Sequence, residues 1–262
     1  MRGQGPMRRL VDLLIFDLDG TLVDSRLDLA ASVNHALRRM GLAPLSVETV
    51  AGFVGDGVQA LLTRALTAAR GAADPAEMEA GLQVFREHYA THLLDATRAY
   101  PGVPEALQAL GHKAMAIATN KPRTYALAIL EGLGLHHQFR LVVGGDSTPH
   151  RKPHPAQAEA ILSALGLPPA SALVVGDSPQ DVAMARAVGC GACAVTYGLR
   201  SREELAAAAP DFLLDDLRDL PPPDPLRGRK TATPPGGGVG RHAAMSCGSQ
   251  RPPPTSRRRG SR

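Results

Sequence analysis

Residues 14–24 read LIFDLDGTLVD, and this stretch decides the fold. The apolar run over residues 10–16 predicts a buried parallel strand, because strands covered on both faces are continuously apolar. The strand ends at Asp17 and Asp19, and Gly20 marks the tight turn after it. Two neighbouring carboxylates repel each other unless a cation or a shared proton relieves them. Ligands bind at the carboxyl ends of strands in open α/β sheets, so we expect a binding site here rather than a plain turn with a capping Asp.

The composition is typical of a globular protein with an apolar core. Of 262 residues, 44% are hydrophobic and 3% aromatic, with no Trp, so Ala, Leu and Val must build the core. Three cysteines in a chain of this length make no disulfide framework, which favours a reducing environment. No apolar run is long enough to span a membrane, and the run after the basic N-terminus is too short for a signal peptide. We therefore expect a cytoplasmic monomer or homodimer with no membrane partner.

The C-terminal segment, residues 221–262, differs from the rest of the chain in charge. It carries nine Lys or Arg residues and one acid, whereas residues 1–220 carry 20 basic and 24 acidic residues. The net charge of +4 therefore belongs to this tail. Its Pro, Gly, Arg and Ser content predicts disorder, because so few apolar residues cannot offset the chain entropy lost on folding. A basic tail leaves open the alternative of a nucleic-acid-associated protein, although nucleic acid is not the partner we expect.

Two hydrophobic patterns follow one another along the chain. Residues 25–95 show helical spacing only, with Ser25 as a possible N-cap of the first helix. Strands and helices then alternate, which predicts a parallel sheet covered on both faces. After the first helix, the expected helices are 47–52, 58–70, 76–94, 103–110, 123–132, 155–166 and 179–188, and the expected strands are 113–119, 140–144, 172–176, 192–196 and 212–214.

These patterns together predict an α/β fold with three parts. A Rossmann-like parallel sheet core, with helices on both faces, comprises residues 1–24 and 96–220. Residues 25–95 form an inserted all-helical cap, and residues 221–262 form the disordered basic tail.

Further polar residues follow other predicted strands of the sheet. Thr119 and Asn120 follow one strand, and their hydroxyl and amide groups suit phosphate oxygens near a helix N-terminus. Lys152 precedes a helix that starts with Pro, and its ammonium can neutralise carboxylates or a phosphate. Asp177 and Asp181 follow another strand. Each signal alone is also typical of helix capping or of a solvated loop, but together they place four acids at one sheet edge.

This combination of residues predicts phosphoryl chemistry. Hard oxygen ligands in such number suit Mg²⁺, which bridges protein carboxylates and phosphate groups. A carboxylate can take the phosphoryl group as a nucleophile and release it to water in a second step. Metal, lysine and backbone N–H groups stabilise the negative charge of the transition state.

Four ordered stretches resemble the motifs of the haloacid dehalogenase superfamily. They are DLDGTLVDS at residues 17–25, TNK at 119–121, KP at 152–153 and GDSPQD at 176–181. The Asp-x-Asp form of the first motif is similar to that of the phosphatases of this superfamily. The helical insert, with FVGDGVQALLTRAL at 53–66, and TYG at 196–198 resemble its phosphoglycolate phosphatase-like branch. The resemblance covers residues 9–220.

The resemblance implies roles for particular residues. Asp17 would be the nucleophile, and Asp19 the general acid and base, with its carbonyl also reaching Mg²⁺. Asp177 would be a metal ligand, Asp181 a ligand or its neighbour, and Lys152 would anchor the nucleophile and the phosphate. The catalytic residues implied are thus Asp17, Asp19 and Lys152, and the metal-binding residues are Asp17, Asp19, Asp177 and Asp181.

The resemblance also implies a set of substrate-binding residues. Thr119 and Asn120 would hold the phosphoryl oxygens, and the loop of the cap at residues 55–57 would close over the substrate and exclude water. The residues implied in substrate binding are Gly20, Thr21, Gly55, Asp56, Gly57, Thr119 and Asn120. Because an acid beside an anionic substrate is unfavourable, we expect the backbone of Asp56 to matter more than its side chain.

The expected function is therefore that of a Mg²⁺-dependent phosphomonoester hydrolase acting on a small phosphorylated metabolite. The resemblance implies 2-phosphoglycolate as the substrate and a phospho-aspartate intermediate. A phosphatase or mutase acting on a sugar phosphate or pyrophosphate is the alternative within the same class. The alternative from a different class is the nucleic-acid-associated protein acting through its basic tail.

Overall fold

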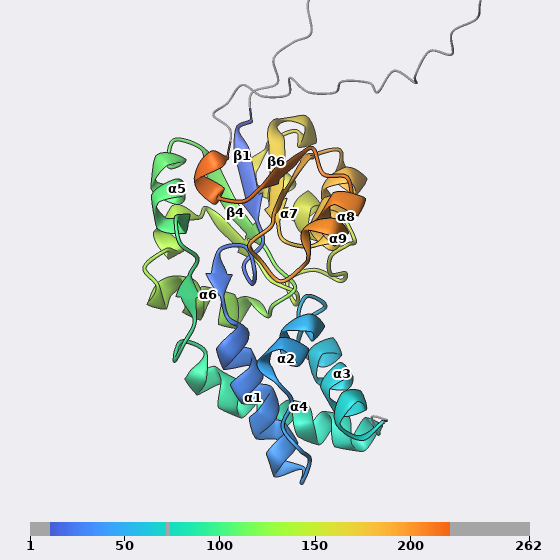
Figure 1. Cartoon of the computed structure of the whole chain (residues 1–262). Coiled ribbons are helices and arrows are strands. Elements are labelled where there is room, and N and C mark those ends of the chain that lie inside the picture. Colours follow the sequence, from blue (N-terminus) through green and yellow to red (C-terminus); the bar gives the residue numbers. More distant parts are fainter. Residues whose placement is uncertain (1–10, 72–73, 221–262) are drawn as a thin grey trace, which may run out of the picture. The chain divides into compact units, whose positions relative to one another are not determined.

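A six-stranded parallel sheet forms the centre of the computed structural model, which describes residues 11–71 and 74–220 (Figure 1). The strand order is β5-β4-β1-β6-β7-β8, and every neighbouring pair is parallel. The strands are β1 (Leu13–Phe16), β4 (Ala114–Ala118), β5 (Leu141–Val143), β6 (Ala172–Gly176), β7 (Gly191–Val195) and β8 (Phe212–Leu214). The predicted α/β fold class is thereby confirmed.

Helices cover both faces of this sheet. They are α5 (Val103–Ala109) and α6 (Arg123–Gly132) on one face, and α7 (Ala156–Leu165), α8 (Pro179–Val188) and α9 (Arg202–Ala207) on the other. In β1, Leu14 and Phe16 belong to the first apolar cluster, whereas Leu13 and Ile15 belong to the second. Alternate side chains of a strand point to opposite faces, so the continuous apolar run fills both layers.

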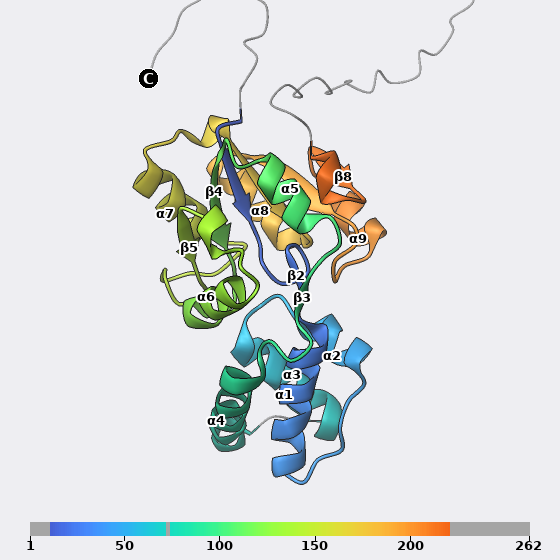
Figure 2. The ribbon, with the colours of Figure 1, turned by 90° about the vertical axis from the view of Figure 1, so that its left-hand side faces the viewer.

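Four helices between β1 and β4 form a separate group at the carboxyl ends of the strands (Figures 1 and 2). They are α1 (Arg26–Arg39), α2 (Val47–Phe53), α3 (Val58–Arg70) and α4 (Pro75–His92), and we call them the cap. Helices α1 and α4 pack against each other, and α3 packs on both. The domain boundaries at residues 24/25 and 95/96 stay predictions.

A short antiparallel ribbon connects the core and the cap (Figure 2). It pairs β2 (Val23–Asp24) with β3 (Arg98–Ala99), so that the chain enters and leaves the cap at neighbouring points. The buried carboxylate of Asp28 in α1 accepts hydrogen bonds from the backbone N–H of Ala96 at 2.9 Å and of Thr97 at 2.7 Å, and from the Thr97 hydroxyl at 2.6 Å. Asp28 thus fixes the returning segment to the first turn of the cap.

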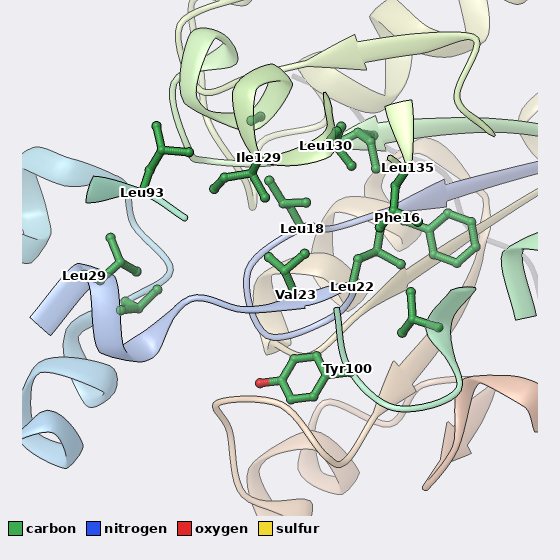
Figure 3. Packing of buried hydrophobic residues seen from close by; sticks show 14 of the residues in the cluster. Phe16, Leu18, Leu22, Val23, Leu29, Leu93, Tyr100, Ile129, Leu130 and Leu135 are labelled. Atoms are coloured by element: carbon green, nitrogen blue, oxygen red, sulfur yellow. The ribbon is translucent and has the colours of Figure 1, made fainter. Parts of the chain in front are cut away.

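The apolar core of one sheet face continues into the cap. Phe16 of β1, Leu22 of the following turn, Val23 of β2 and Leu29 of α1 belong to one cluster, which also contains Leu93 after α4. Figure 3 shows these side chains along the path from the sheet to the cap. The connection is therefore packed with side chains rather than being a solvated linker.

Some local expectations differ from the structure. Ser25 occupies the N-cap position of α1, but its hydroxyl makes no cap hydrogen bond and instead donates to Asp19 Oδ1 at 2.5 Å. The expected N-cap position of Ser25 is therefore confirmed, although its hydroxyl binds the Asp19 carboxylate, the stronger acceptor, instead of a backbone N–H group. The sequence shows no recognisable pattern for the ribbon β2–β3, whose strands have two residues each, or for the six-residue helix α9.

The tail predicted to be disordered, residues 221–262, lies outside the described residues. No helix among the described residues combines the length and the apolar character that crossing a membrane requires.

Candidate active site

Apart from Lys152, the predicted core site residues follow β1, β4 and β6 in the chain. The carboxyl ends of these strands face the cap (Figure 1). A cavity of about 50 Å³ lies there, between the core and the cap. Its core side includes Asp17 and Asp19 after β1, Thr119 after β4, and Asp177 after β6. Residues 55 and 57 line it from the cap. The fold therefore brings together polar groups that are 160 residues apart in the chain, Asp17 and Asp177 among them.

Three carboxylates form the centre of the site. Asp17, Asp177 and Asp181 each offer an oxygen atom, and these atoms lie within 4.8 Å of one another. The side chain of Asp17 is 12% exposed, and Asp177 and Asp181 are 3% and 1% exposed. Like charges at this distance with little solvent require a counter-charge.

Lys152 supplies part of this counter-charge. Its Nζ atom lies 2.8 Å from Asp17 Oδ1 and 2.7 Å from Asp181 Oδ1. Burial lowers the pKa of Lys152, but the two carboxylates outweigh this effect and hold the pKa above its usual value. Lys152 is therefore charged, and it bridges the ends of β1 and α8.

The cluster still lacks positive charge at Asp177. Burial, reinforced by the charges of Asp17 and Asp181, raises the pKa of Asp177 to about 8. Burial also raises the pKa of Asp17 to about 6, although the Lys152 ammonium opposes it. Within the described chain, the carboxylate of Asp177 has no ion-pair partner, and it accepts only from Leu199 N–H at 2.7 Å and the Thr21 hydroxyl at 3.4 Å. The carboxylates of Asp17, Asp177 and Asp181 carry more negative charge than Lys152 offsets. They therefore fit a divalent cation, which prefers oxygen ligands.

Glycines allow the carboxylates to approach the backbone so closely. Gly20 has φ of +85°, and a Cβ atom there would lie 2.1 Å from Asp177 Oδ2. A Cβ atom at Gly176 would lie 2.1 Å from Asp181 Cγ. No larger residue fits either position without displacing a carboxylate, so Gly20 makes room for Asp177 and does not itself line the cavity.

Asp19 forms a second, separate ion pair. Lys121 Nζ lies 2.8 Å and 2.9 Å from its two oxygens, and the Ser25 hydroxyl donates to Oδ1. Lys121 is buried, and Asp19 outweighs the effect of burial and raises the pKa of its ammonium. The sequence assigns no role to Lys121 of the TNK stretch, because one Lys after a strand shows no pattern that distinguishes it from a solvated residue.

The Asn120 side chain is occupied by backbone groups. Its Nδ2 donates to Gly55 O at 2.8 Å and Lys152 O at 3.1 Å, and its Oδ1 accepts from Lys152 N at 2.9 Å. Asn120 thus connects the cap, β4 and the Lys152 segment. Thr119 lines the cavity beside it. The roles of both residues in holding phosphoryl oxygens stay predictions.

The acid in the cap loop is neutralised locally. Asp56 accepts from Arg64 of α3 and from Gln180 of α8, both as short contacts. Gly55 and Gly57 on either side line the cavity, whereas the Asp56 side chain points to these partners. This geometry explains how an acid can lie next to a site for anions.

Arg200 is a further residue of the site that the sequence analysis missed. It follows β7, lines the cavity, and donates from Nη1 to Gly52 O at 3.3 Å and from Nη2 to Val54 O. The guanidinium therefore connects the core to the end of α2. Thr21, by contrast, does not line the cavity. Its hydroxyl donates to Asp177, and its backbone carbonyl accepts from the Tyr197 hydroxyl at 2.9 Å.

Comparisons with known proteins agree with this geometry. The sequence pattern of the haloacid dehalogenase-like hydrolases matches residues 14–195. Phosphoglycolate phosphatase 1 of Pseudomonas aeruginosa is 41% identical over 219 residues, which cover 82% of this chain and 80% of that protein. Phosphoglycolate phosphatase of Chromobacterium violaceum is 41% identical over 213 residues, which cover 80% of this chain and 96% of that protein.

A solved structure extends this agreement to the fold. The predicted phosphoglycolate phosphatase of Haemophilus somnus superposes with a TM-score of 0.77 at 36% identity, over 82% of this chain and 97% of that one. The family pattern begins in β1 with the stretch before Asp17 and ends in β7, so it contains every core carboxylate of the site. Matches of this extent and identity show that the chain belongs to the haloacid dehalogenase-like hydrolase family.

Proposed function

We propose that the protein is a Mg²⁺-dependent phosphatase that hydrolyses 2-phosphoglycolate to glycolate and phosphate. The observation that carries this proposal is the buried cluster of Asp17, Asp177 and Asp181, short of positive charge and beside a cavity under the cap. The names of the relatives support the substrate. The small cavity also supports a small leaving group.

Two of the three carboxylates keep more acceptor capacity for a metal than the third. We assign Asp17 and Asp177 as ligands, together with the backbone carbonyl of Asp19. Asp181 accepts from Lys152 on one oxygen and from the Ser178 hydroxyl and N–H on the other. Both of its oxygens are therefore occupied, and it positions Lys152 beside Asp17. Bound Mg²⁺ would neutralise phosphate oxygens and stabilise the charge of the transition state.

In the first step, a carboxylate oxygen of Asp17 attacks phosphorus. A bond forms between this oxygen and phosphorus, and the bond from phosphorus to the substrate oxygen breaks. Asp19, which is protonated at the start of this step, gives its proton to the departing alkoxide, which leaves as glycolate, and becomes the carboxylate that pairs with Lys121. Lys152, at 2.8 Å from Asp17, orients the nucleophile and offsets the charge gathered there.

In the second step, water hydrolyses the phospho-aspartate. The carboxylate of Asp19 takes a proton from water, whose oxygen attacks phosphorus while the bond to Asp17 breaks. Lys121 and Ser25 hold Asp19 in a fixed orientation throughout both steps. The products are phosphate and the original Asp17 carboxylate, so atoms and charges balance over the cycle.

Phosphate release from a panel of esters tests this proposal. The panel contains 2-phosphoglycolate, sugar phosphates and pyrophosphate, each assayed with Mg²⁺ and with EDTA. We expect kcat/KM to be highest for 2-phosphoglycolate, and activity to be lost in EDTA and in Asp17→Asn. Asp12→Asn is the matched control, because Asp12 is exposed at the opposite end of β1.

The other outcomes separate the alternatives. Preference for a sugar phosphate or pyrophosphate would keep the chemistry and replace the substrate. Full activity of Asp17→Asn would refute the assignment of Asp17 as the nucleophile. No hydrolysis of any ester would overturn the proposal and favour the mutase or the nucleic-acid alternative.

A further inference from the structure

The two sides of the cavity differ in chemistry. The core side carries charged and polar groups, among them Asp17, Asp19 and Lys121. The cap side is formed by the glycines of the loop and by Leu29, Val54, Val58 and Leu61. In the described part of the cap, Tyr89 of α4 is the only cavity-lining residue with a polar side-chain atom.

The hydroxyl of Tyr89 is buried and has no hydrogen-bond partner among the residues that the structure describes. The side chain is fully buried, with a relative exposure of 0%. A buried hydroxyl without a partner is unfavourable and rare in folded proteins. Because Tyr89 lines the cavity, a molecule bound there can supply the missing partner.

Neighbouring rings hold Tyr89 in place. Phe85 stacks on its ring with centroids 5.3 Å apart, and Tyr125 contacts it edge-on at 5.2 Å. The Lys121 ammonium lies over the ring, 5.0 Å from its centroid. The hydroxyl is therefore preorganised, and it needs no rearrangement to bind a ligand.

The charges that act on this hydroxyl are the Lys121 ammonium and the carboxylates of Asp19 and Asp28, and a further cation, Arg200, lines the same cavity. Lys121 and Arg200 both line the cavity, and the Arg200 guanidinium donates to backbone carbonyls only, with no carboxylate partner within the described residues. Burial raises the pKa of Tyr89 to about 12, so the phenol stays neutral and keeps its proton to donate. A carboxylate is the strongest common acceptor for such a donor.

We propose that the Tyr89 hydroxyl donates a hydrogen bond to the carboxylate of the substrate and thereby selects carboxylated leaving groups. This inference rests on the proposed function, which puts the phosphoryl group at Asp17. With the phosphorus there, the rest of a short ester extends toward the cap, where Tyr89 is the polar side chain that meets it.

The test compares two esters that differ in one group. Ethyl phosphate has the two carbons of 2-phosphoglycolate but no carboxylate. In Tyr89→Phe, we expect kcat/KM for 2-phosphoglycolate to fall by about 10- to 100-fold, mostly through KM, and that for ethyl phosphate to change by less than about twofold. Tyr125→Phe is the matched control, since it removes a neighbouring hydroxyl that does not line the cavity.

A stability measurement separates binding from a structural role. The free Tyr89→Phe variant should melt at the same temperature as the wild type or higher, because no hydrogen bond is lost. A lower melting temperature, or equal losses on both esters, would overturn the inference and leave the proposed function intact. If Tyr89→Phe kept the preference of the wild type for 2-phosphoglycolate over ethyl phosphate, the inference would likewise be overturned and the proposed function left intact. A wild type that does not prefer 2-phosphoglycolate over ethyl phosphate would overturn both.

Discussion

The ion pair between Lys121 and Asp19 is nearly buried, with side-chain exposures of 4% and 12%. Removing one partner of such a pair leaves an uncompensated charge in a poorly solvated site. We expect Lys121→Met to lower the free energy of unfolding by about 3–5 kcal/mol. Urea denaturation, followed by circular dichroism, measures this change.

A double-variant cycle tests whether the loss comes from the pair. Asp19→Asn combined with Lys121→Met should cost less than the sum of the single changes, because neither charge is then left alone. Additive losses would show that Lys121 acts through its apolar stem or another neighbour.

Asp177 makes stability depend on pH in the absence of metal. Its pKa is raised to about 8, so between about pH 4 and pH 8 the folded state binds more protons than the unfolded state. The free energy of unfolding therefore falls as pH rises through this window. In EDTA at pH 8, we expect Asp177→Asn to be more stable than the wild type by about 2–5 kcal/mol, with a smaller difference at pH 5.

Added Mg²⁺ should reverse this order. The wild type gains binding energy that the Asn variant lacks, so its melting temperature should rise more, and more at pH 8 than at pH 5. A stabilisation by Mg²⁺ that is equal in both proteins would contradict Asp177 as a ligand.

The grouping of Asp17, Asp177 and Asp181 was predictable, whereas the partners of these residues were not. The prediction succeeded because carboxyl ends of parallel strands meet at one edge. The sequence does not predict Lys121, Tyr89 or Arg200 as site residues, because each is a single residue whose importance comes from its tertiary contacts. Tyr89 in particular occupies a helical core position, and its burial rather than its spacing identifies it.

At the level of elements, the attachment of the cap depends on Asp28. Its carboxylate accepts three donors from residues 96 and 97 while it is 3% exposed. Because the variant leaves buried N–H groups unpaired, we expect Asp28→Ala to lower the free energy of unfolding by about 2–4 kcal/mol and to raise KM. Urea denaturation and steady-state kinetics measure these two effects.

Asp24→Ala is the matched control for this prediction. Asp24 pairs with Arg26 at the surface, where the side chains are 32% and 45% exposed. An exposed pair contributes less than about 1 kcal/mol. Equal losses in both variants would mean that the charge, and not the connection to residues 96 and 97, is what matters.

The elements that the sequence predicted well are those with clear periodicity or burial. Helices α3, α6 and α8 and strand β6 have the expected bounds, because glycine or proline stands at their ends and apolar residues fill them. The β2–β3 ribbon could not be predicted, since two residue pairs show no pattern and their pairing depends on the cap being folded.

At the scale of the whole molecule, the cavity residues that the structure describes all lie between residues 17 and 200. We therefore expect truncation after Leu220 to leave kcat/KM for 2-phosphoglycolate within about twofold of the full chain and the melting temperature within about 2 °C. Calorimetry and phosphate release on both proteins measure these values. Loss of activity on truncation would show that residues 221–262 take part in function.

The paired strands β2 and β3 place the two crossings into the cap side by side. An inserted segment whose ends lie so close together imposes no change of register on the sheet that carries it. Evolution could therefore exchange the whole insert at this position, or enlarge it, while the carboxylates at the strand ends kept their geometry. One junction between β2 and β3 would in this way allow a single phosphoryl-transfer centre to acquire new substrates.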